Sequence, residues 1–270
     1  MDASSLTRSA RRRAGWALRE YLPAGLLLGG LLLFWEWWVR TFDTKPYVLP
    51  APSRIWDAFI ETKGLLPDHI RTTMTEAILG LFVAAALGVA LAVLIASIPL
   101  VRRVLYPLLV VSQTIPMIVL APLLIIWFGF GLTPKVVVVA LVGFFPIVVA
   151  TSDALMRADS EMVGLVRSMG GNRVQVMRHV LIPSALPAFF SGLQIAAAYA
   201  VTGAVIGEWV GASSGLGLFI TRSQTAFRVD RVFVAVAVVA LASMALFAAV
   251  HIMARLVAPW MYAQERQEEA

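Results

Sequence analysis

The sequence contains no cysteine, only three histidines and only three lysines. Without cysteine there is no disulfide framework and no thiolate metal site. The histidines, His69, His179 and His251, are too far apart in the chain to show metal-ligand spacing. No lysine is followed by serine or threonine within a glycine pattern, so the chain has no P-loop for nucleotide phosphates. Because nucleophile–base spacing is absent as well, we predict that the chain is not an enzyme and holds no metal or cofactor of its own.

Charged residues are also scarce. They make up 14% of the 270 residues, whereas hydrophobic residues make up 60% and the mean hydropathy is +0.83. These values lie outside the range of soluble domains and indicate an integral membrane protein. A pI near 10.2 would suggest nucleic-acid binding in a soluble protein. In a membrane protein the same excess of basic residues marks cytoplasmic loops, so we expect no nucleic-acid partner.

Apolar runs predict an all-α membrane protein with six transmembrane helices in one domain. The domain covers residues 21–258, between a basic N-terminus at residues 1–20 and a tail at residues 259–270. The predicted spans are residues 21–39, 73–98, 104–128, 135–151, 188–209 and 232–250. The first run lacks a small-residue cleavage site, which favours an uncleaved span over a signal peptide. Both termini are predicted to be cytoplasmic, because that orientation places more Lys and Arg residues inside than outside.

Glycine and proline residues within the runs predict local geometry. Gly80 and Gly88 in the second span predict a close approach to another helix. Pro116 predicts that the third span is kinked or locally unwound, and Pro146 predicts a break in the fourth. The pair Arg102-Arg103 predicts a cytoplasmic turn before the third span.

A polar stretch at residues 153–187 separates the fourth and fifth spans. Helical patterns lie on both sides of Gly170-Gly171-Asn172, a sequence typical of a helix end followed by a new N-cap. Gly170 permits a sharp turn, and Pro183 is expected to end the second helix before the fifth span. We interpret the stretch as a docking surface for a soluble partner. The alternative is a solvated loop whose positive charge only fixes the topology.

This stretch resembles the loop found in permeases of binding-protein-dependent ABC importers. The family pattern is Glu-Ala-Ala, three residues, Gly, nine residues, Ile-x-Leu-Pro. Gly170 takes the glycine position, and Val180-Leu-Ile-Pro183 takes the final positions. Gly164 stands where the family has glutamate, and Glu161, one helical turn earlier, is expected to take over part of that role.

Other segments resemble one subfamily of these permeases. They are VLPAPSRIW at residues 48–56, QTIP at 113–116, APLLIIWFG at 121–129, and the Gly-Glu pair at 207–208 ahead of SGLG at 214–217. The third and fourth spans most resemble permeases for a thiamine pyrimidine precursor or riboflavin, and sulfonate, taurine and nitrate permeases are the alternatives. No Lys or Arg lies in the middle of a predicted span, which favours a neutral or weakly charged solute.

The resemblance implies a type I importer permease in the bacterial inner membrane. It would form a homodimer or pair with a second permease. It would bind two cytoplasmic ATPase subunits, which would hold ATP and Mg²⁺, and an external solute-binding protein would deliver the solute. The implied ATPase-coupling residues are Glu161, Gly164, Gly170, Arg173, Val174, Met177, Arg178, Val180, Ile182 and Pro183. Val174 and Met177 are expected to anchor in a groove of the ATPase, with Arg173 and Arg178 at its rim.

Polar and aromatic residues within the spans are candidates for the translocation path. They are Gln113, Thr114, Phe144, Phe145, Tyr199, Thr202 and Glu208. Hydrogen bonding between helices is an alternative for the polar residues, and ordinary packing is one for the phenylalanines. Glu208 is expected either to line an outer gate or to cap the loop after it, and Glu36 and Glu76 to reach water. A secondary transporter that works without an ATPase remains an alternative function.

Overall fold

The structure is a computed structural model that describes residues 3–262, and its regular elements are all helices. The predicted all-α class is confirmed. Residues 1–2 and 263–270, which belong to the predicted terminal segments, lie outside the described residues. The chain forms two compact units, one of Met1–Lys63 with Ser223–Val234 and one of Gly64–Arg222 with Ala235–Ala270.

The first unit contains helix α1 (Ala3–Thr41) and helix α2 (Pro52–Thr62). Within α1, residues Leu22–Thr41 are long and apolar enough to cross a membrane. Glu36 does more than reach water, because its carboxylate accepts hydrogen bonds from the backbone and hydroxyl of Ser53 at 3.0 and 2.8 Å. Arg40 adds an ion pair at 2.5 Å. These contacts join the end of α1 to the first turn of α2.

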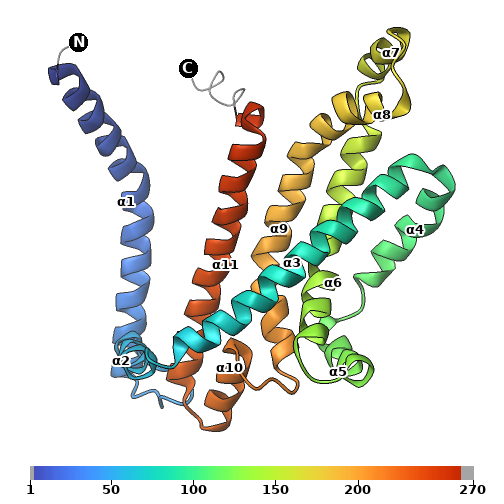
Figure 1. The fold of residues 1–270 in the computed structure, drawn as a ribbon. Helices are drawn as coiled ribbons and strands as arrows, with labels where there is room; N and C mark the ends of the chain where they lie inside the picture. The colour runs from blue at the N-terminus through green and yellow to red at the C-terminus, as the bar shows by residue number, and fades with distance from the viewer. Residues whose placement is uncertain (1–2, 263–270) are drawn as a thin grey trace. The chain divides into compact units, whose positions relative to one another are not determined.

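Three helices form the centre of the second unit: α3 (Leu66–Ser97), α6 (Leu132–Met156) and α9 (Ile182–Glu208) (Figure 1). Small residues bring α3 and α6 together, as predicted. A Cβ atom at Gly80 would overlap the side chain of Val139, and one at Gly88 would lie 2.7 Å from Cγ2 of Ile147. The core around these contacts is rich in alanine and also includes the later turns of helix α11 (Val229–Val257).

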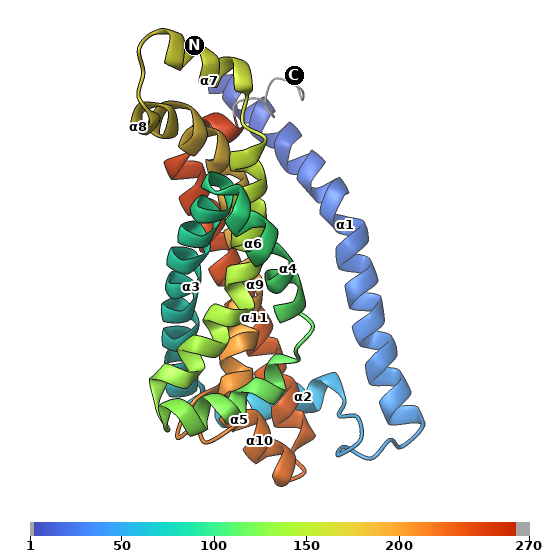
Figure 2. The ribbon, with the colours of Figure 1, turned by 90° about the vertical axis from the view of Figure 1, so that its right-hand side faces the viewer.

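The predicted third span is a bent helix pair, α4 (Pro99–Ser112) and α5 (Met117–Phe128). The two helices meet at an angle of 102° across a four-residue break that ends at Pro116 (Figure 2). The expected break is confirmed, but Arg102 and Arg103 lie inside α4 and not in a turn. Pro99 starts the new helix directly after Ile98, because proline suits the first position of a helix. Five helices could cross a membrane by length and composition, or six if the bent pair is one span.

Two expected helix ends are wrong. Helix α6 continues through Pro146, although proline removes one backbone hydrogen bond there. Pro183 does not end a helix either, because it occupies the first turn of α9. The preceding residues Met177–Leu181 form a π-helical turn, and its wider backbone spacing accommodates the proline ring. The chain is therefore helical without interruption from Arg173 to Glu208.

The remaining elements of the second unit are short. Helix α7 (Ser160–Ser168) and helix α8 (Arg173–Val176) lie beyond the ends of α6 and α9 in both views (Figures 1 and 2). Helix α10 (Leu216–Thr225) lies at the other end of α9. A 3₁₀ turn, Pro259–Tyr262, follows α11.

Candidate functional site

The polar stretch folds as the sequence predicts, as two helices joined by a tight turn. Asp159 caps α7 by accepting hydrogen bonds from the N–H groups of Glu161 and Met162 at 2.8 and 3.4 Å. At the other end, Gly170 N–H donates to the Arg167 carbonyl at 3.0 Å, and Gly171 N–H donates to the Val166 carbonyl at 2.9 Å. This pair of bonds, with Gly170 at φ +85°, is a Schellman motif.

Gly171 is sterically more restricted than Gly170. A Cβ atom at Gly171 would lie 2.6 Å from the Val166 carbonyl oxygen, whereas a Cβ at Gly170 would meet nothing within 4 Å. Asn172 then caps α8 through a reciprocal pair with Gln175, in which both backbone N–H groups find side-chain acceptors at 2.7 and 2.9 Å. The sequence analysis placed Gly171 in the break between the helices but did not identify its steric restriction, and it did not use the capping-box spacing of Asn172 and Gln175.

Some side chains of α8 and the π-helical turn pack into the protein, and others are exposed to solvent. Val176 and Val180 are buried and fix the segment to its own protein. Val174 is 72% exposed, whereas Met177 is half-buried. The two residues expected to anchor together in a partner are therefore not equally available. Arg173 and Arg178 are exposed, as expected for a rim.

Helix α7 carries an apolar face that the sequence reasoning did not single out. Met162, Leu165 and Met169 are 50%, 53% and 79% exposed, and their spacing places them along one side of the helix. A surface hollow of about 270 Å³ adjoins this face. It is lined by Val166, Met169, Gly170, Gly171, Gln175 and His179. Glu161 and Gly164 are exposed, and a Cβ at Gly164 would meet nothing within 4 Å.

A second polar cluster is buried at the opposite end of α6. Lys135 Nζ lies 2.6 Å from Glu76 Oε1, and the two side chains are 10% and 2% exposed. The expectation that Glu76 reaches water is therefore wrong, because α6 and α9 cover this turn of α3. Glu76 Oε2 is buried without a hydrogen-bond partner among the described residues. Lys135 is thus an ammonium held inside the protein, at the start of a span.

Glu208 extends this cluster and caps the loop that follows α9. It accepts hydrogen bonds from Thr73 Oγ1 at 2.6 Å and from Gly217 N–H at 2.5 Å. A Cβ at Gly215, where φ is +126°, would overlap the Glu208 carboxylate, so the glycines let the backbone close over it. His69 Nδ1 receives the Gly215 N–H at 3.0 Å. Of the two roles expected for Glu208, the structure shows the cap.

The other candidates for the translocation path do not converge on one site. Gln113 and Thr114 are exposed at the break between α4 and α5. Phe144 and Phe145 are half-buried and pack against the core. Tyr199 and Thr202 are exposed and three residues apart on α9, so they share one uncovered face of that helix.

The chain has extensive similarity to known proteins. Residues 84–262 match the family model described as binding-protein-dependent transport system inner membrane component. The formylaminopyrimidine transport permease protein ThiX of Halalkalibacterium halodurans is 38% identical over 231 residues, which is 85% of this chain and 92% of that protein. The riboflavin transport system permease protein RibX of Chloroflexus aurantiacus is 37% identical over 243 residues, 88% of this chain and 89% of its own.

More distant similarity extends over the same region. The taurine transport system permease protein TauC of Escherichia coli is 27% identical, over 93% of this chain and 94% of its own. Among solved structures, an inward-facing conformation of the MetNI methionine ABC transporter superposes with a TM-score of 0.64 at 20% identity, covering 73% of this chain and 98% of that one. At this identity the superposition shows a shared fold.

Proposed function

The chain belongs to the family of binding-protein-dependent transport system inner membrane components, and from that membership we propose how its residues take part in import. It is a multi-pass inner-membrane protein and the permease subunit of an ABC importer. We propose that two such permease subunits, identical or paired, form the translocation path. Two ATPase subunits would bind ATP and Mg²⁺, and an external binding protein would deliver the solute.

The surface that contacts the ATPase comprises α7, the Schellman turn and α8. The observation that carries this assignment is an apolar face, Met162, Leu165 and Met169, that is exposed on a segment outside the membrane spans. Exposed apolar residues of this kind mark interaction sites in proteins. Arg167, exposed between them on the same short helix, can pair with acidic groups at the rim of a partner's groove. Glu161 and Gly164 lie on the same helix and belong to the proposed contact. Both termini would lie on this cytoplasmic side.

The local caps make this surface rigid enough to transmit movement. The Schellman bonds fix the end of α7, and the reciprocal Asn172–Gln175 pair fixes the start of α8. From Arg173 the helix runs on to Glu208, where the buried cluster ties it to α3 and to the loop after α9. Displacement of α8 by an ATPase subunit would therefore move the far end of α9, as rocking between inward-facing and outward-facing states requires.

We propose that the solute is a thiamine pyrimidine precursor or a riboflavin-like compound. The identity is 38% to a formylaminopyrimidine permease and 37% to a riboflavin permease, against 27% to the taurine permease, and this difference supports the assignment. Tyr199 and Thr202 on the uncovered face of α9 are the residues we assign to the path, since a hydroxyl and an aromatic ring suit a neutral heterocycle.

Reconstitution tests this function. The permease, its ATPase and its binding protein are placed in proteoliposomes, and uptake of radiolabelled formylaminopyrimidine, riboflavin and taurine is measured with and without ATP. We expect ATP-dependent uptake of one heterocycle. Uptake that needs neither ATP nor the ATPase would contradict the importer assignment, and uptake of taurine alone would contradict the solute assignment.

A further inference from the structure

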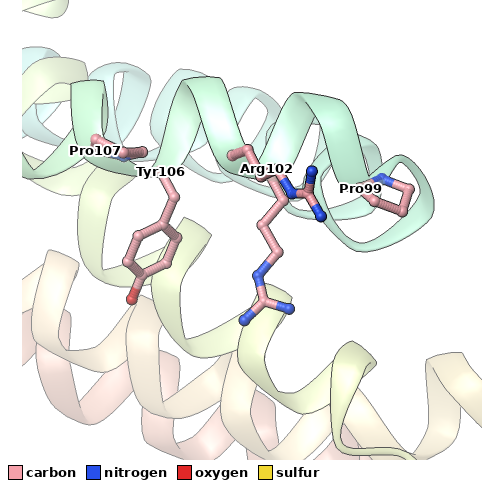
Figure 3. Close-up of a pocket in the computed structure, with 5 residues that line it drawn as sticks. Pro99, Arg102, Tyr106 and Pro107 are labelled. Carbon is pink, nitrogen blue, oxygen red and sulfur yellow. The ribbon is translucent and has the colours of Figure 1, made fainter.

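A hollow of about 380 Å³ on the second unit contains two arginine side chains. It is lined by Pro99, Arg102, Arg103, Tyr106 and Pro107, all from the first three turns of α4. Figure 3 shows Arg102 and Tyr106 between the two prolines along the helix. Arg102 and Tyr106 are four residues apart, so both lie on the same side of α4. The hollow therefore presents guanidinium groups and a phenol hydroxyl together.

No carboxylate pairs with the two arginines in the part of the chain whose side chains the structure describes. Among residues 22–260, whose side chains the structure describes, neither Arg102 nor Arg103 takes part in an ion pair, and no acidic residue lines the hollow. Both arginines lie early in α4, three and four residues after its first residue, Pro99. Both guanidinium groups are exposed, so an anion can reach them from solvent or from the membrane surface.

The surroundings indicate where that anion comes from. Val101, Leu105 and Leu109 pack α4 against the last turns of α3 and the second half of α6, so the hollow lies at the end of α6 that leads into α7. On the outer side of α4, Leu100, Val104 and Leu108 are 70%, 53% and 57% exposed. A helix with one apolar side exposed and a basic hollow at its end fits the boundary between acyl chains and head groups.

We propose that Arg102, Arg103 and Tyr106 form a binding site for a phosphate group, supplied by the head group of an anionic phospholipid such as phosphatidylglycerol or by free phosphate. Guanidinium groups bind phosphate oxygens with two parallel hydrogen bonds, and the tyrosine hydroxyl can donate a third. The exposed apolar residues of α4 favour the lipid, because its acyl chains would cover them. The site goes beyond the proposed import function and needs only that this end of the bundle lies at a membrane surface.

Native mass spectrometry of the full-length permease in a mild detergent tests the site. Phosphatidylglycerol, phosphatidylcholine or inorganic phosphate is added, and retained ligand is counted for the wild type and for R102Q/R103Q. We expect the double variant to bind phosphatidylglycerol about 25-fold more weakly, from about fivefold for each arginine, with little change for phosphatidylcholine. The matched control R71Q/R222Q removes two exposed arginines, one in the first turns of α3 and one in the last turn of α10, and is expected to bind like the wild type.

The outcomes separate the two sources of phosphate. Arginine-dependent binding of phosphatidylglycerol that inorganic phosphate does not displace identifies the lipid. Arginine-dependent binding of inorganic phosphate alone identifies the free ion. Equal retention of phosphatidylglycerol by the wild type and by R102Q/R103Q, with helical content unchanged in circular dichroism, would overturn the site, as would an equal loss in the control variant.

Discussion

Lys135 is expected to be among the most stability-sensitive residues of the chain. Its ammonium pairs with Glu76 at 2.6 Å, beside Glu208, and all three side chains are buried. Replacing Lys135 by methionine keeps the volume of the side chain but leaves Glu76 charged and unpaired inside the protein. Breaking a buried ion pair in this way costs about 3–5 kcal/mol in the free energy of unfolding. For a unit of this size, that corresponds to a melting temperature lower by roughly 10 °C.

A second variant separates the charge effect from loss of packing. In Lys135→Met/Glu76→Leu both members of the pair are removed, so no unpaired charge remains between them, and we expect at least half of the lost stability to return. Lys63→Met is the matched control, because Lys63 is exposed and its loss should change the free energy of unfolding by less than about 0.5 kcal/mol.

The assay is thermal unfolding of the purified permease in detergent, followed by circular dichroism. A Lys135→Met protein that melts within about 2 °C of the wild type would refute this reasoning. The reasoning would equally be refuted if the double variant lost as much free energy of unfolding as Lys135→Met and Glu76→Leu lose together, because the effects of independent sites add and those of coupled sites do not.

Three further predictions concern single positions. Gly170→Ala should cost about 1–2 kcal/mol, and Gly171→Ala should destabilise the turn by more than that. Gly171→Ala should also abolish uptake while membrane insertion, measured by fractionation, is unchanged. Equal uptake by both variants would contradict the assigned geometry. Gly164→Glu should stabilise α7 by about 1 kcal/mol in thermal unfolding, since an exposed helix position with free space gains from replacing glycine, and a lower melting temperature would contradict the free space around Gly164. The hydrogen bond from Arg228 lowers the pKa of Glu61, so the stability from this carboxylate is present above its unfolded pKa and is lost as the pH falls through the folded one. Glu61→Gln should therefore reduce the fall in melting temperature on acidification, and an unchanged pH profile would contradict this role.

The sequence predicts those features that depend on neighbouring residues. The turn at Gly170 and the cap at Asn172 need only the local chemistry of helix ends, and both are where the sequence places them. The close contact at Gly80 and Gly88 was also predictable, because small residues on one face of an apolar helix indicate close packing against another helix. Long apolar runs were enough to predict the all-α class.

The features that were missed depend on tertiary context. Glu76 and Lys135 are separated by 59 residues, and nothing local to either one indicates that α3 and α6 bring them together. Pro183 was expected to end a helix, but a π-helical turn before it allows the helix to continue, and such turns have no local pattern in the sequence. The apolar face of α7 is periodic in the sequence, yet its exposure became visible only in the structure.

Site-specific cross-linking tests the coupling assignment most directly. The chain has no cysteine, so Met169→Cys introduces a single thiol on the exposed face of α7 without further changes. Arg71→Cys, exposed in the first turns of α3, is the control. The assembled importer is treated with a short maleimide cross-linker that joins the thiol to an amine or thiol of the partner. We expect Met169→Cys to cross-link to the ATPase subunit, with a yield that changes when ATP binds. We expect Arg71→Cys to give no such product. Cross-linking of Arg71→Cys but not of Met169→Cys to the ATPase would contradict the assignment of α7 and α8 as the coupling surface.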